Sequence, residues 1–139
     1  MAPTLFGNAG LEHMEKYGTK AEHFAKIAEK NHRHSVNNPY SQFRDVYTLK
    51  QVMDSTKIYA PLTKLQCCPT SDGAAAAIVV SEDFVTTYGL ENQAIEISAI
   101  TMKSDYANTF GNSSIDLIGG SMAKAAAQEA YQMAGVTPD

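Results

Sequence analysis

Residues 74–80 read AAAAIVV, a continuous apolar run that follows a Ser-Asp-Gly turn at 71–73 and ends at the polar Ser81. An apolar run of this length without a polar interruption is typical of a strand buried on both faces of a parallel sheet. Such a strand needs helices over its faces and partner strands beside it. This run therefore constrains the fold more than any other segment.

The order of elements after this run predicts an α/β chain. A short helix is predicted over 82–88 behind a Ser81 cap, and the alternating segment 94–102 predicts a second strand. A long helix is predicted over 115–134, ending at Gly135. A strand-helix-strand-helix unit normally continues into another parallel strand. We therefore expect the chain to be an excerpt of a larger unit, which is oligomeric or strand-swapped when isolated.

The first half of the chain has a helical pattern. Residues 19–22 read TKAE, a capping box that predicts a helix fading near Ser35. A shorter helix is predicted over 11–17. Residues 48–51 suggest another capped turn, which predicts a helix over 49–53.

Composition excludes several classes of function. The net charge of −4 leaves no basic stripe for nucleic acid, and no apolar run approaches the length of a membrane span. The two cysteines, Cys67 and Cys68, are neighbours and do not form a disulfide framework, so we expect reduced thiols in an intracellular protein. The four histidines lack an accompanying cluster of ligands, so no metal site is expected.

Three stretches carry a resemblance to a known family. They are HMEKYGTKAEHFAKIAEKNHRHSVNNPYSQF at 13–43, LQCCPTSDGAAAAIVVSE at 65–82 and MAGVTPD at 133–139. Together they resemble the thiolase domain of the sterol carrier protein X family, over about residues 5–139. The resemblance implies a 3-ketoacyl-CoA thiolase (acyl-CoA C-acyltransferase) of fatty-acid or sterol side-chain β-oxidation. It also implies a peroxisomal homodimer that uses coenzyme A as substrate and needs no cofactor.

The resemblance also assigns parts of the chain to a partial thiolase fold. Residues 1–65 correspond to the mostly helical loop domain, and residues 66–93 to the last strand and helix of the N-terminal half. Residues 94–139 correspond to the start of the C-terminal half. The family's G-H-P, C-x-G and H-D-C-F or N-E-A-F motifs do not occur in this sequence, and its nucleophile is expected outside the chain. We therefore expect no catalytic residue here.

Two residues are candidates for the CoA and substrate channel. By the resemblance, Cys68 stands where many thiolases carry a serine that lines the pantetheine channel. Packing is its alternative role, and catalysis a further one. Tyr17 stands where thiolases place a loop residue against the acyl-CoA pocket, and its alternative is to finish a helix against the core. The basic residues Lys26, Lys30 and Arg33 either meet nucleotide phosphates or form a solvated helix face.

Two hypotheses of function follow. In the first, the chain is a segment of a thiolase that contributes channel wall and core and is inactive alone. In the second, it is a non-enzymatic module that binds acyl-CoA or lipid, or mediates an interaction.

Overall fold

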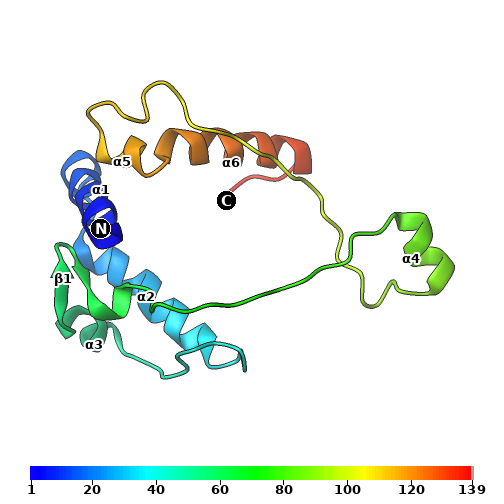
Figure 1. Cartoon of the computed structure of the whole chain (residues 1–139), viewed down its shortest axis with the longest axis horizontal. Helices are drawn as coiled ribbons and strands as arrows, with labels where there is room; N and C mark the ends of the chain where they lie inside the picture. Colours follow the sequence, from blue (N-terminus) through cyan, green and yellow to red (C-terminus); the bar gives the residue numbers. More distant parts are fainter. Residues whose placement is uncertain (139) are drawn as a thin grey trace.

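Three helices and a small hairpin form the N-terminal body of the computed structural model, which describes residues 1–138 (Figure 1). Helix α1 spans Ala2–Tyr17 and helix α2 spans Ala21–Ser35. Helix α3 (Leu49–Asp54) precedes strands β1 (Lys57–Tyr59) and β2 (Leu62–Thr63), which pair antiparallel. A 3₁₀ turn, η1 (Lys64–Gln66), follows. The hairpin is an element that the sequence pattern did not predict.

Three helices make up the rest of the regular structure. They are α4 (Glu82–Tyr88), α5 (Ser114–Leu117) and α6 (Gly120–Ala134). Figure 1 shows α5 and α6 on the α1 side of the molecule and α4 far from every other helix. Helices and a two-stranded sheet thus occur together, in broad agreement with the predicted mixed class.

The two predicted strands are wrong for this structure. Neither 74–80 nor 94–102 belongs to a hydrogen-bonded strand, and both run as irregular chain (Figure 1). Their apolar side chains face solvent, with Ile78 92% and Ile97 62% exposed. The continuous apolar run at 74–80 and the alternation at 94–102 indicate side chains suited to burial in a sheet, but a strand forms only where a partner accepts its backbone hydrogen bonds. Residues 1–138 supply no such partner for either segment.

Helix ends show where local sequence signals suffice. The Thr48 cap is confirmed: its hydroxyl accepts from Gln51 N at 3.3 Å, and Gln51 Oε1 accepts from Thr48 N at 2.8 Å. The Ser81 cap is also confirmed, since its hydroxyl accepts from Phe84 N at 3.2 Å. Gly135 ends α6 in the left-handed conformation, as predicted.

The capping box predicted at 19–22 is wrong. Helix α2 begins after Lys20, and the Thr19 hydroxyl hydrogen-bonds the Nδ1 atom of His13 at 2.8 Å instead. A side chain of the preceding helix therefore takes the group that would have capped α2. The C-terminal end of α2 at Ser35 agrees with the prediction.

Helix α1 begins nine residues earlier than the predicted 11–17. Its first turn holds a proline, which is tolerated there because the first helical N–H groups lack intrahelical partners. Gly7 lets the hairpin approach, since a Cβ at this position would come within 2.9 Å of the Ala60 carbonyl oxygen and closer still to the Tyr59 ring. Tertiary packing thus explains a glycine that would weaken an isolated helix.

The single helix predicted over 115–134 is two helices. Gly119 has φ +89°, a left-handed conformation that interrupts the helical hydrogen bonding between α5 and α6. Residues near 101–103 run beside α6: the Thr101 hydroxyl donates to the Ala126 carbonyl at 3.1 Å, and Lys103 pairs with Glu129. No helix among residues 1–138 is both long and apolar enough to cross a membrane.

One carboxylate connects helix α1 to the start of helix α5. Glu12 of α1 accepts hydrogen bonds from the Ser113 hydroxyl at 2.7 Å and from the backbone N–H groups of Ser114 at 2.5 Å and Ile115 at 3.2 Å. The Ser113 hydroxyl is the main cause of a lowered pKa at Glu12. The Ile115 and Ser114 amides and the charge of Lys16 act in the same direction, and desolvation opposes them.

We predict that this attachment depends on the ionised form of Glu12. A lowered folded-state pKa means that the contact stabilises the structure above the ordinary Glu pKa of about 4.3 and is lost as the pH falls below it. In NMR spectra, the backbone amide signals of Ser114 and Ile115 should shift together on acidification. Glu12→Gln should produce the shifted signals already at neutral pH, whereas Glu15→Gln, on the exposed side of α1, should not. Unchanged signals in Glu12→Gln would contradict the prediction.

We also predict that the isolated chain self-associates through its unpaired apolar segments. Such segments present unpaired backbone groups beside exposed isoleucines, which is the usual template for edge pairing. Light scattering at micromolar concentration should show a mass above 15.0 kDa. The double variant Ile78→Lys/Ile97→Lys should move the mass toward the monomer. The control Ile27→Lys, at a 56% exposed position on α2, should not.

Candidate functional site

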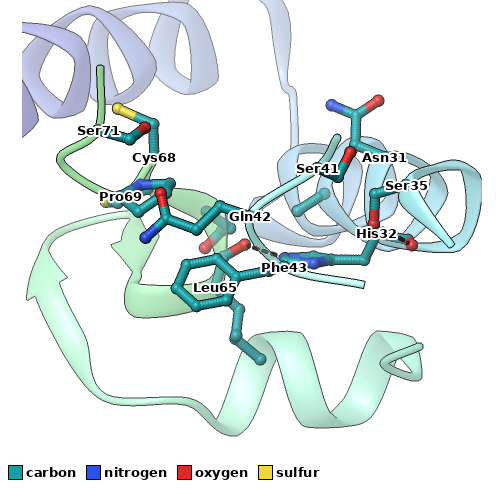
Figure 2. Close-up of a pocket in the computed structure, with 13 residues that line it drawn as sticks. Asn31, His32, Ser35, Ser41, Gln42, Phe43, Leu65, Cys68, Pro69 and Ser71 are labelled. Carbon is teal, nitrogen blue, oxygen red and sulfur yellow. Dashed lines mark hydrogen bonds between the residues drawn. The ribbon is translucent and has the colours of Figure 1, made fainter. Parts of the chain in front are cut away.

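Two hollows meet at the adjacent cysteines, between α2 and the segment that follows η1. Their volumes are about 440 and 680 Å³. Figure 2 shows Asn31, His32 and Ser35 of α2 on one side of the first hollow, and Cys68 and Pro69 on the other. The residues that line both hollows are His32, Phe43, Leu65, Cys67, Cys68 and Pro69.

His32 fixes the position of η1 against α2. It donates through Nε2 to the Leu65 carbonyl at 2.9 Å, across 33 residues of sequence (Figure 2). Its ring also lies edge-on to Tyr47, with the ring centroids 4.9 Å apart. Because Cys67 N donates to the Lys64 carbonyl at 3.1 Å, holding η1 also holds the first cysteine. His32 is therefore a positioning residue for this site.

A small apolar core lies directly beneath the site. Ala25 and Ala28 of α2 and Val52 of α3 are buried, and Leu65 packs against them. Thr63, which is 6% exposed, donates from its hydroxyl to the Val52 carbonyl at 2.8 Å. This bond joins β2 to the end of α3, so the hairpin and η1 leave the core at a fixed angle.

Gln66 combines a satisfied oxygen with an unsatisfied nitrogen. Its Oε1 accepts from Thr63 N at 2.8 Å and lies 2.9 Å from the Thr63 hydroxyl oxygen, whose proton is donated to the Val52 carbonyl. Its Nε2 is buried and finds no acceptor among residues 1–138. Gln66 also lines the first hollow, so an unsatisfied buried amide nitrogen belongs to a residue of its wall.

The two thiols occupy different environments. Cys67 is half-buried and Cys68 is exposed, and neither forms a disulfide. Burial raises the pKa of the Cys67 thiol, and the neighbouring Cys68 raises it further. At neutral pH Cys67 is thus a protonated, poorly nucleophilic group in the wall.

The structure does not bring the second candidate, Tyr17, into this site. Tyr17 ends α1, is 60% exposed and stacks at 4.6 Å on His13, with the Lys16 ammonium 5.3 Å from its ring centroid. It lines neither of the two hollows that contain Cys68. The roles of Cys68 and Tyr17 in a CoA channel both stay predictions.

Other candidate groups have structural partners. Lys26 lies 3.5 Å from Glu22 and Arg33 lies 3.8 Å from Glu29, which is the arrangement of a solvated helix face. Within residues 1–138, no group of three or more His, Cys, Asp or Glu side chains is placed to hold a metal ion. Sequence reasoning missed His32, Phe43 and Gln66 as site residues, because only the tertiary fold places them beside Cys68.

Comparison with known proteins places this chain beside two named groups. It is 58% identical over 140 residues to human sterol carrier protein 2, with 100% of the chain and 26% of the human protein aligned. It is 48% identical to the non-specific lipid-transfer protein-like 2 of Caenorhabditis elegans, over 100% of the chain and 34% of that protein. No protein-family model matches the chain.

Two more distant relatives are named as an acetyltransferase and as a thiolase subunit. The chain is 35% identical to an acetyl-CoA acetyltransferase of Methanothermobacter thermautotrophicus, over 98% of the chain and 34% of that enzyme. It is 32% identical to the benzoylsuccinyl-CoA thiolase subunit BbsB of Thauera aromatica, over 91% of the chain and 32% of the subunit. The chain thus spans between a quarter and a third of these relatives.

We predict that removing the His32 ring loosens the wall around Cys67. His32→Ala leaves the Leu65 carbonyl without its donor, so η1 should open and expose the half-buried thiol. In a Cys68→Ser background, the rate of alkylation of Cys67 at pH 8 should increase several-fold, because the reagent reaches the Cys67 thiolate more easily. The matched control is His34→Ala, at an exposed position two residues along α2, and it should leave the rate unchanged.

Proposed function

We propose that this chain is a segment of an acyl-CoA C-acyltransferase, a 3-ketoacyl-CoA thiolase of the sterol carrier protein X type that acts in fatty-acid or sterol side-chain β-oxidation. One observation carries the proposal: between 91% and 100% of this chain aligns both with the lipid-transfer group and with the acetyl-CoA acetyltransferase and the thiolase subunit. A segment that aligns with both groups belongs to a structural unit that both groups contain. We therefore assign it to a thiolase-type acyl-CoA-handling unit.

In this proposal the segment lines part of the acyl-CoA channel and contributes no reacting group. Cys68 and its neighbours line hollows of sufficient size for an extended arm. The nucleophile, its activating base and the oxyanion donors come from other parts of the enzyme. Such preorganised walls act by positioning the thioester and excluding water. A peroxisomal location and a homodimeric parent belong to the same proposal.

A second candidate function rests on the relatives' names. Human sterol carrier protein 2 and the nematode lipid-transfer protein-like 2 share the highest identities quoted above. In the second candidate, the chain binds acyl-CoA or lipid without taking part in catalysis.

Binding calorimetry on the purified chain separates the two candidates. The first candidate predicts that CoA and a long-chain acyl-CoA bind and that the free fatty acid does not. The second predicts that the fatty acid and the acyl-CoA bind while CoA alone does not. A parallel assay with a 3-ketoacyl-CoA and CoA should give no thiolysis. Turnover would disprove the assignment of the reacting groups to other parts, and absence of all binding would argue against a ligand wall in this segment.

A variant at the hollow tests where the ligand lies. Cys68→Leu fills the junction of the two hollows and should weaken acyl-CoA binding by about tenfold, the loss expected from about 1.4 kcal/mol of lost contact. The control Thr87→Leu makes a comparable change at an exposed position of α4. It should bind as the unchanged chain does.

A further inference from the structure

We propose that Cys68 is a site of reversible covalent modification, at which a small-molecule disulfide forms a mixed disulfide that occupies the adjoining hollows. The proposal goes beyond the proposed function and does not require that the chain bind acyl-CoA. It rests on the contrast between two neighbouring thiols, on the space in front of one of them and on the geometry of adjacent cysteines.

The first argument is accessibility. Thiol–disulfide exchange begins with attack by an accessible thiolate on a disulfide sulfur. Cys68 is exposed, whereas Cys67 is half-buried with a pKa raised by burial. Of the two, Cys68 is the thiol that a dissolved disulfide reaches.

The second argument is space and polarity around the adduct. Cys68 lines both hollows, of about 440 and 680 Å³, so the attached half has room to lie along the protein surface. Phe43, Leu65 and Pro69 offer apolar contact there. Gln66, whose buried Nε2 lacks an acceptor among residues 1–138, also lines the first of these hollows.

The third argument is persistence. A second thiol beside a mixed disulfide normally expels the small molecule by closing an internal disulfide. Here that product would join adjacent residues, whose Cα atoms lie about 3.8 Å apart across a trans peptide. Normal disulfides span roughly 4.4–6.8 Å between Cα atoms. Ring closure is therefore strained, and the protonated Cys67 is a poor attacking group, so the adduct at Cys68 should accumulate.

The small-molecule disulfide is itself the oxidant in this reaction, so no further reactant is needed. The Cys68 thiol loses its proton, and the thiolate attacks one sulfur of the small disulfide. The new Cys68–sulfur bond forms as the original sulfur–sulfur bond breaks. The other half leaves as a thiolate and takes up a proton. Cys68 is oxidised, and the released half is reduced to a free thiol.

Mass spectrometry of the full chain after incubation with glutathione disulfide at pH 7.5 tests the proposal. We expect one glutathionyl group per chain, located at Cys68 by peptide mapping and removed by dithiothreitol. Cys68→Ser should slow adduct formation by at least about tenfold, whereas the matched Cys67→Ser should form the adduct as fast as the unchanged chain.

Three outcomes would overturn the proposal. They are modification at Cys67 in place of Cys68, loss of both thiols without added mass, and no adduct under conditions that modify a free cysteine peptide. Serine at the exposed position 68 leaves packing intact, and a circular dichroism spectrum identical to that of the unchanged chain would confirm this. Acyl-CoA binding is measured separately, so that failure of the proposed function leaves this result interpretable.

Discussion

The contact between α2 and α3 is the interaction on which the site depends. Ala25 and Ala28 present only methyl groups, so α3 approaches α2 closely enough to bury Val52 completely. Close approach of this kind yields dispersion contact over a small area and leaves no space for water. Thr63 hydrogen-bonds the Val52 carbonyl of that core, and His32 hydrogen-bonds the Leu65 carbonyl of η1. These two bonds position η1, and the cysteine pair follows η1 directly in the sequence.

Attachment of the C-terminal helices follows different physics. The α1 face meets α5 through the Glu12 carboxylate, which accepts three hydrogen bonds from Ser113, Ser114 and Ile115. A charged acceptor at the start of a helix satisfies N–H groups that have no intrahelical partner. The lowered pKa of Glu12 predicts that ordering here depends on pH, whereas the α2–α3 core is apolar. The two halves of the described chain therefore respond to different conditions.

Local signals predicted the helices well and the site poorly. The capping residues Thr48 and Ser81 act within one turn, so sequence alone located them. Thr19 failed as a cap because His13, from another helix, took its hydroxyl. A strand was predicted at 74–80 from a continuous apolar run and at 94–102 from alternation. Such patterns indicate which side chains favour burial, but pairing requires a neighbouring strand, and residues 1–138 provide none.

By itself, the sequence determined the positions of most helices, the Thr48 and Ser81 caps and the resemblance to thiolases, because these depend on neighbours within a few residues or on short motifs. The resemblance also singled out Cys68. Only the tertiary structure decided that Cys67 is half-buried while Cys68 is exposed, that His32 and Phe43 flank them, and that Tyr17 lies elsewhere. The reason is physical: burial and hydrogen bonding between residues far apart in sequence arise only when packing brings their elements together.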